Sequence, residues 1–101
     1  MDVFAVLAEP HRRSIVDHLG AHDGASVGDL VTLLGLTQPA VSKHLRILRD
    51  VGLVRSDPQG QRRIYRLDPT PLRAVDDWLA PYRRRWIAAL DRLERHLGDR
   101  P

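Results

Sequence analysis

One short run of the sequence carries small, polar and basic side chains at a spacing that suits contact with DNA bases. Four of its residues recur at i, i+3, i+4 and i+7 and would share one face of a helix: Pro39, Ser42, Lys43 and Arg46. An α-helix fits the major groove, where Gln38 could pair with adenine and Lys43 could donate to guanine. The alternative is an ordinary amphipathic helix whose polar side faces water, because the helical period alone says nothing about a partner.

The helix that would carry this face has recognisable ends. Thr37 suits the N-cap, since its hydroxyl can accept a hydrogen bond from the first turn, and Pro39 fits within that turn. Gly52 suits the left-handed residue that follows a helix. An apolar stripe recurs at i, i+4 and i+7, formed by Val41, Leu45 and Leu48. We therefore expect a helix over 37–52 with one buried and one polar face.

The sequence offers few residues that could bind a metal and none that could carry out thiol chemistry. The chain has no cysteine, which excludes disulfides, thiolate metal sites and thiol redox sensing. His18 and His22 are four residues apart and could share a helical face. A second group on the last helix is a poor set of zinc ligands: Asp76, Asp77, Glu94 and His96. We expect no metal site and no cofactor, and a metal-responsive protein is kept as an alternative.

The sequence also shows no group of residues with the spacing of a catalytic site. Asp76 and Asp77 are adjacent on an expected helix, so they point about 100° apart and cannot act as a dyad. Ser14 lies near His11 and His18, but within a helix that has a buried face and implies no pocket. We expect that the protein is not an enzyme.

The bulk composition indicates one small basic domain over residues 1–101. The 101 residues are 43% hydrophobic, and 16 Lys and Arg against 13 Asp and Glu give a net charge of +3. A basic balance suits nucleic-acid binding without proving it. The N-terminus has no basic region of a signal peptide, and no apolar run approaches the roughly 20 residues that span a membrane. We expect a cytoplasmic protein.

The elements around the polar helix follow from periodicity and turn residues. We expect helices over 2–8 and 10–22, and a third helix that Ser26 caps with Asp29 in a capping box and Gly35 ends. The tight connection from Gly35 to Thr37 makes 26–52 a helix-turn-helix.

Two strands should follow, over 53–57 and 61–67, with a turn at Pro58-Gln-Gly60. Such a hairpin after the polar helix is a wing (about 53–67). Its tip offers Gln59, Gln61, Arg62 and Arg63 to phosphates or to the minor groove. The alternative is a solvated hairpin whose arginines protect its edge.

A long helix should cover about 69–97, with a kink near 77–79 because Pro81 lies inside it. Its apolar positions approach a heptad spacing, so we expect it to pair with the same helix of a second chain, assisted by the first helix. The expected dimer interface comprises Val3, Phe4, Leu7, Leu79, Tyr82, Trp86, Leu90, Leu93 and Leu97. The alternative is that this helix folds wholly onto its own domain.

Four strings together resemble the ArsR/SmtB family of bacterial winged-helix repressors. They are Leu7-Ala-Glu-Pro-His-Arg-Arg-Ser-Ile-Val16, Leu36-Thr-Gln-Pro-Ala-Val-Ser-Lys-His-Leu45, Leu48-Arg-Asp-Val-Gly-Leu-Val54 and Gly60-Gln-Arg-Arg-Ile-Tyr-Arg-Leu67. The resemblance implies a mainly α (α+β) winged helix-turn-helix of order α-α-α-α-β-β-α. It also implies a homodimer through the first and last helices, with two recognition helices in successive major grooves.

The resemblance also implies that Gln38, Pro39, Ser42 and Lys43 read bases and that the 59–63 tip is the wing contact. Together with Thr37 and Arg46 from the helix pattern, the residues expected to meet double-stranded DNA are Thr37, Gln38, Pro39, Ser42, Lys43, Arg46, Gln59, Gln61, Arg62 and Arg63. His11 and His44 belong to the matching strings, where packing or backbone contact is their expected role. The chain lacks the third-helix cysteine motif of the metal-sensing members and looks like a metal-independent branch. Which small-molecule effector acts on it, if any, is not readable from the sequence.

The expected function is therefore a sequence-specific DNA-binding transcriptional regulator. We expect a homodimeric repressor of a pseudo-palindromic operator, with its own promoter as one candidate target. The alternative from another class is a winged-helix module that binds protein rather than DNA. Such a module should have an uncharged or acidic recognition face, which Lys43 and Arg46 argue against.

Overall fold

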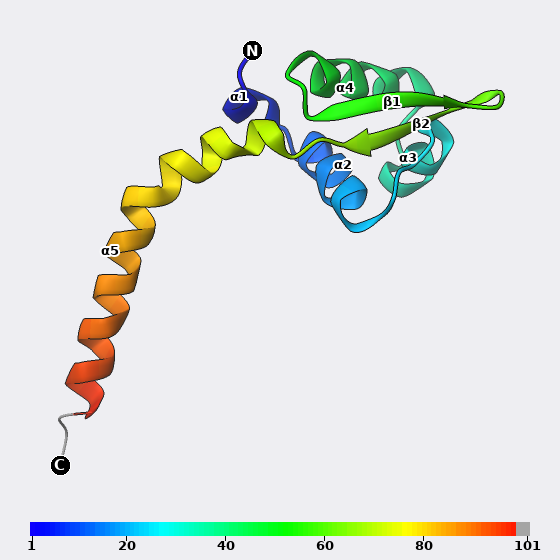
Figure 1. Ribbon diagram of the computed structural model, residues 1–101. Helices are drawn as coiled ribbons and strands as arrows, with labels where there is room; N and C mark the ends of the chain where they lie inside the picture. The colour runs from blue at the N-terminus through cyan, green and yellow to red at the C-terminus, as the bar shows by residue number, and fades with distance from the viewer. Residues whose placement is uncertain (99–101) are drawn as a thin grey trace.

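The chain folds in the predicted order of helices and strands (Figure 1). The computed structural model describes residues 1–98. The helices are α1 (Val3–Leu7), α2 (Pro10–Ala21), α3 (Val27–Leu34), α4 (Gln38–Asp50) and α5 (Arg73–Gly98), with a 3-10 turn η1 (Thr70–Leu72) before α5. The strands are β1 (Val54–Gln59) and β2 (Arg62–Leu67). The expectation of a mainly α winged helix-turn-helix is confirmed.

The helix-turn-helix is held by its caps, as the sequence predicts. Ser26 and Asp29 form a reciprocal capping box at the start of α3, in which the Ser26 N–H donates to Asp29 Oδ2 over 3.0 Å and the Asp29 N–H donates to Ser26 Oγ over 3.2 Å. Gly35 ends α3 with φ +65°. Because this left-handed conformation favours glycine, the chain can turn at once into the cap of α4.

The turn of the wing begins two residues further along than predicted, and β1 is correspondingly extended. Pro58 and Gln59 belong to β1, where they pair with Arg63 and Arg62. The prediction of a turn at 58–60 was wrong because a two-stranded hairpin consists of edge strands only, and an edge strand tolerates proline. Gly60, with φ +64°, opens the loop instead, which suits a two-residue hairpin turn.

The wing is also tied to the loop after α2. Ala25 and Tyr65 form an isolated bridge, in which the two residues exchange N–H···O bonds of 3.0 and 2.8 Å. Gly24 precedes this bridge with φ +109°, and a Cβ there would lie 2.7 Å from Ile64 Cγ2. Only glycine allows the loop to approach the wing this closely.

The core gathers the apolar faces of the first four helices and the base of the wing. The apolar stripe predicted for α4 is buried, as is the corresponding stripe of α2: Ile15, Val16, Leu19, Val41, Leu45 and Leu48. Arg12 and Arg13, on the first turn of α2, cap the end of α1. The Arg12 Nε–H donates to the Val6 carbonyl over 2.7 Å and Arg13 Nη1 to the Leu7 carbonyl over 2.9 Å. These bonds serve carbonyl groups that a helix end leaves unpaired.

The helix α5 extends far from the globular part and bends in its yellow portion (Figure 1). The molecule measures 67 × 26 × 22 Å with a radius of gyration of 18.8 Å, whereas a compact chain of this length has a radius of about 13 Å. Near the bend, Arg83 donates to the Asp76 carbonyl over 3.1 Å and pairs with its carboxylate over 2.7 Å. Pro81 lies between these residues and lacks an N–H. Within residues 1–98, no helix combines the length and apolar character that crossing a membrane requires.

Candidate nucleic-acid interface

The helix α4 is built as a rigid support with two different faces. Thr37 Oγ1 accepts a hydrogen bond from the Ala40 N–H over 3.3 Å, and Pro39 lies in the first turn. At the other end the Leu53 N–H donates to the Leu48 carbonyl and the Gly52 N–H to the Arg49 carbonyl. This pair of bonds, with Gly52 at φ +80°, is a Schellman motif.

The predicted base-reading residues lie opposite the buried stripe of α4. Gln38, Pro39, Lys43 and Arg46 are exposed, and Ser42 is partly buried. Thr37 is exposed at the cap while its hydroxyl is engaged with the backbone. The structure therefore brings together small and hydrogen-bonding groups at the start of α4 and cations one to two turns further on. Such a face can enter a major groove without displacing any core residue.

The wing supplies a second polar surface beside this helix. Strand β1 contacts α4, and the tip of the hairpin projects beyond the globular part (Figure 1). The predicted wing residues are all exposed: Gln59, Gln61, Arg62 and Arg63. Arg63 lies one strand pair below the tip, where its Nη1 donates to Ser56 Oγ over 3.1 Å.

Arg62 also faces α3. Its Nη2 lies 4.0 Å from Asp29 Oδ2, and both side chains are largely exposed. Hydrogen bonds from the backbone and side chain of Ser26 lower the pKa of Asp29 below its usual 3.8, and the Arg62 charge adds to this effect. An exposed ion pair of this kind is weak. Arg62 can therefore exchange this carboxylate for a DNA phosphate at little cost.

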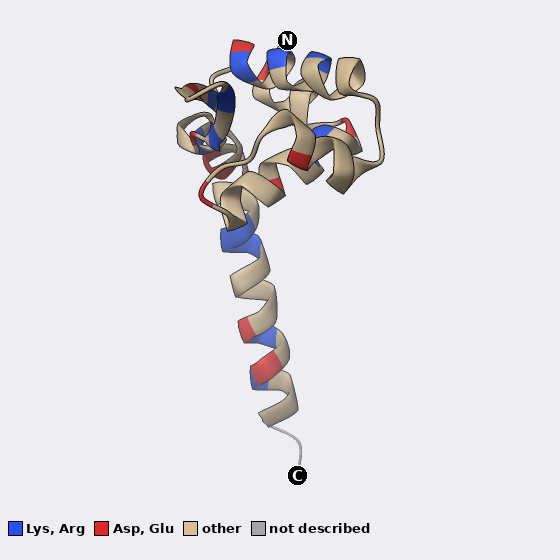
Figure 2. Ribbon diagram, turned by 90° about the vertical axis from the view of Figure 1, so that its right-hand side faces the viewer, with Lys and Arg blue, Asp and Glu red and all other residues tan. Residues whose placement is uncertain are grey.

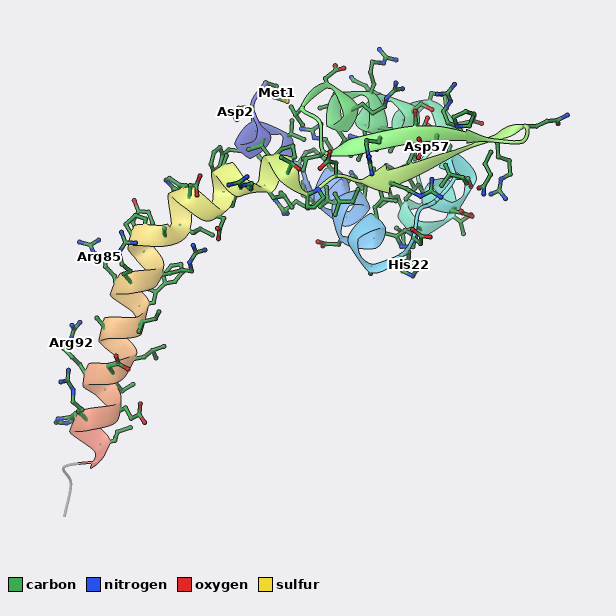
Figure 3. All side chains as sticks on the ribbon, viewed as in Figure 1. Met1, Asp2, His22, Asp57, Arg85 and Arg92 are labelled. Atoms are coloured by element: carbon green, nitrogen blue, oxygen red, sulfur yellow. The ribbon has the colours of Figure 1, made fainter. Side chains whose placement is uncertain are left out.

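Cations are not confined to the helix-turn-helix. Figure 2 shows Lys and Arg on the globular part and a further blue band on α5, just below that part. The sequence of α5 includes three consecutive arginines, Arg83, Arg84 and Arg85. Arg83 is engaged with Asp76, and Figure 3 shows Arg85 with Arg92 on one side of α5. These arginines lie on the helix that leads away from α4 and the wing, so they are separate from the candidate interface.

The predicted dimer residues divide into two groups. Val3 is buried within the chain itself, and Leu7 and Leu79 are partly buried. Phe4 lies edge-to-face with Trp78, with ring centroids 5.9 Å apart, which joins α1 to α5. The remaining apolar side chains of α5 form an exposed stripe: Tyr82, Trp86, Leu90, Leu93 and Leu97.

The two metal groups considered from sequence are not assembled within this chain. His18 and His22 do share a face, with stacked rings whose centroids are 4.1 Å apart. However, His22 Nδ1 donates to the His18 carbonyl over 2.9 Å, and within residues 1–98 no third histidine or carboxylate joins the pair at ligand distance. Asp76 and Glu94 lie 18 positions apart on one helix, about 27 Å at 1.5 Å per residue.

The structure brings together a different group, which the sequence reasoning missed. Glu9, His11 and His44 each offer one ligand atom, and these atoms all lie within 4.8 Å of one another. His44 comes from α4 and the other two from the start of α2. No local spacing could reveal this group because it depends on a contact between helices 33 positions apart in the chain (His11 to His44).

A shallow depression between α2 and α3 is a second feature that the sequence did not predict. It measures about 380 Å³ and is lined by Ser14, Asp17, His18, Leu33 and Leu34. Within residues 1–98, no side-chain hydrogen bond joins Ser14 to His18. The pairing of nucleophile and base that activates a serine is therefore not formed there.

Comparison with known proteins agrees with this architecture. Residues 7–57 match a family described as a helix-turn-helix domain. The chain is 48% identical over 69 residues to the HTH-type transcriptional regulator Rv2034 of Mycobacterium tuberculosis, a match that covers 68% of this chain and 64% of that protein. It is 31% identical over 78 residues to the transcriptional repressor SdpR of Bacillus subtilis, covering 77% of this chain and 86% of that one.

Solved structures show the same arrangement. An ArsR family transcriptional regulator, RHA00566, superimposes with a TM-score of 0.71 at 32% identity, covering 82% of this chain and 84% of the other. The homodimeric winged helix-turn-helix DNA-binding domain Mb0332 of Mycobacterium bovis gives a TM-score of 0.64 at 28% identity, covering 78% and 75%. With the wing, the capped α4 and these matches together, the chain belongs to the ArsR/SmtB family of winged helix-turn-helix transcriptional regulators.

Proposed function

We propose that the protein is a homodimeric transcriptional repressor that binds a pseudo-palindromic DNA operator in the cytoplasm. The observation that carries this proposal is the exposed face of α4, with Gln38, Ser42 and Lys43 beside an exposed basic wing. In this reading Gln38 and Lys43 contact base edges, Ser42 adapts to either strand, and Arg62 and Arg63 contact phosphates. Repression is steric, because an occupied operator blocks the promoter.

The exposed stripe of α5 supports the dimer. Four of its side chains are each more than half exposed: Trp86, Leu90, Leu93 and Leu97. A large exposed apolar patch on a single chain usually marks an interaction surface. Pairing two copies of α5 would cover this stripe, with Phe4 and Tyr82 at its upper end. A two-fold dimer would present two copies of α4 to half-sites about 34 Å apart, one turn of DNA. The described structure of Mb0332 is itself homodimeric.

The test is a fluorescence-anisotropy titration on two kinds of DNA. One is the region upstream of the protein's own gene, and the other is duplex enriched by the protein from a random library. Both are measured with excess non-specific competitor, at two salt concentrations, and with EDTA or zinc. We expect competitor-resistant binding to an enriched sequence with two-fold symmetry, two chains to each duplex.

Three outcomes separate the alternatives. Binding that disappears with salt and enriches no sequence would overturn the proposal and favour a protein-interaction module. Enrichment of a single half-site by a monomer would overturn the dimer alone. Release by zinc from an operator would show that the repressor is metal-responsive.

A further inference from the structure

Three side chains from two helices converge where the start of α2 meets the recognition helix α4. Glu9 caps α2, His11 lies in its first turn, and His44 projects from the middle of α4. His11 Nδ1 lies 3.0 Å from Glu9 Oε1, and His44 Nδ1 lies 4.0 Å from Glu9 Oε2. The two imidazole rings have centroids 5.8 Å apart. The carboxylate therefore lies between two ring nitrogens that come from different helices.

The nitrogen of His44 has no partner of its own. Its Nδ1 is buried, yet it makes no hydrogen bond to any of residues 1–98. A buried polar atom without a partner is uncommon and destabilises the fold, so it calls for a missing ligand, either water or an ion. The His44 side chain is only 17% exposed, whereas those of Glu9 and His11 are 31% and 45% exposed. The group is thus closed on the α4 side and open to solvent on the other.

The geometry points to a divalent metal site formed by Glu9, His11 and His44. We propose that it binds a transition-metal ion of the zinc class, with the two imidazole nitrogens and one carboxylate oxygen as ligands and water in the fourth position. Zinc ligands lie about 2.0–2.2 Å from the ion, so they are about 3.3 Å apart in a tetrahedron. His11 Nδ1 and Glu9 Oε1 are already 3.0 Å apart, and the three ligand atoms all lie within 4.8 Å of one another, so a closure of about 1.5 Å brings the group to that spacing.

The neighbouring groups leave the ligand nitrogens available to a metal. His44 Nδ1 is buried and makes no hydrogen bond within residues 1–98. At His11 a change of tautomer moves the proton from Nδ1 to Nε2 and frees Nδ1 for the ion. Arg12 does not occupy the site through its Nε, because that atom is held by the Val6 carbonyl.

Metal binding through Glu9 leaves the N-cap of α2 intact. Glu9 Oε2 accepts the Arg12 N–H over 3.0 Å, which leaves Oε1 for the ion. An ion held here would link residues 9 and 11 to residue 44 and so join the start of α2 to α4. Because the unfolded chain offers no such assembled site, metal binding should stabilise the folded state.

Cobalt(II) is the probe, since its visible absorption reports the ligands around it. The full chain, freed of metal with EDTA, is titrated with CoCl₂ without DNA, and ZnCl₂ is then added. We expect saturable binding of one ion per chain, displacement of cobalt by zinc, and a higher thermal midpoint with zinc. Glu9→Gln, His11→Gln and His44→Gln should each weaken binding at least tenfold. Glu9→Gln retains an oxygen for the helix cap, and His11 is exposed enough for its variant to fold.

The stacked pair His18 and His22 provides the matched control. The double variant His18→Gln/His22→Gln removes two imidazoles, the number that the proposed site contains, from the C-terminal end of α2. This variant should leave cobalt binding unchanged. Far-UV circular dichroism verifies that every variant is folded. Failure of the wild type to bind cobalt saturably would overturn the site. Binding that His11→Gln leaves intact, or that the His18/His22 variant removes, would overturn it equally.

Discussion

Lys43 is the residue whose removal tests base reading most directly. It is exposed on the face of α4 opposite Val41 and Leu45, and no ion pair holds it within the described residues. If it donates to a base, Lys43→Ala should cost on the order of 1–3 kcal/mol, about 5- to 150-fold in operator affinity. Discrimination between bases at one operator position should fall as well. Anisotropy titration on the operator and on single-base variants measures both.

Arg92→Ala is the matched control for this variant. It removes one positive charge from α5, where Figure 3 shows Arg92 pointing away from the helix. This change should leave operator affinity nearly unaltered. If Lys43→Ala behaves like Arg92→Ala, then the proposed register of α4 in the groove is wrong, because a different face must meet the bases.

Arg62 should act through charge alone. Its present partner is the exposed Asp29 carboxylate at 4.0 Å, which a phosphate can replace. Arg62→Ala should therefore weaken binding to all sequences alike and reduce the slope of log affinity against log salt by about 1. Titrations at several salt concentrations, on operator and random duplex, measure the slope. Arg84→Ala on α5 is the control, and an unchanged slope in Arg62→Ala would show that the wing does not touch phosphate.

At the scale of elements, the capping box of α3 links stability to pH. Hydrogen bonding by Ser26 lowers the pKa of Asp29 below 3.8 in the folded chain, while His18 and Arg62 add a smaller effect. A depressed carboxyl pKa stabilises the fold above the unfolded pKa, and this contribution is lost as pH falls through the folded pKa. The difference in unfolding free energy between wild type and Asp29→Asn should therefore shrink as the pH falls below about 4.

Urea denaturation at each pH measures this difference. Asp77→Asn removes a carboxylate from the exposed surface of α5 and serves as the control for the loss of one negative charge. Asparagine keeps an oxygen that can accept from Ser26, so Asp29→Asn should fold. A difference that stays constant over this pH range would contradict a role for the ionised Asp29 carboxylate in the cap.

Local chemistry predicts the elements of this chain better than it predicts their contacts. Thr37 and the Ser26–Asp29 box mark two helix starts because each cap acts within three residues. The position of the turn in the wing was mispredicted, since Pro58 is tolerated within β1 only because its strand is an edge, which is a property of the whole sheet. The bridge from Ala25 to Tyr65 depends on packing across 40 positions (25 to 65). The contact of His44 with Glu9 likewise has no local signal.

At the scale of the whole molecule, α5 is too long for its own domain to cover. Its first turns contact η1 and α1, where Phe4 meets Trp78, and beyond the bend it extends alone (Figure 1). The last three to four turns therefore leave Leu90, Leu93 and Leu97 exposed, and their spacing places them on one face of the helix. Arg85 and Arg92 share another side (Figure 3). An exposed apolar face does not stabilise a single chain in water. The separation of apolar and basic sides suits pairing with a second helix.

Leu93→Glu tests this pairing. Burying one leucine side chain contributes about 1.5–3 kcal/mol, and a two-fold dimer contains Leu93 twice. The dissociation constant of the dimer should therefore rise about 100-fold or more. Sedimentation equilibrium at micromolar concentration should give wild type a mass of twice 11.5 kDa and the variant a mass close to 11.5 kDa. The variant should also lose most of its affinity for a two-half-site operator, because one α4 then binds without the other.

Arg92→Ala alters the neighbouring position on the basic side of α5 and should remain dimeric. Circular dichroism distinguishes dissociation from unfolding, since most of the core of α1 to α4 does not involve Leu93. A wild type that sediments as a monomer would contradict the proposed dimer at once. A Leu93→Glu variant that stays dimeric would show that the two chains meet elsewhere. The exposed stripe of α5 would then have to be covered by something other than a second copy of α5.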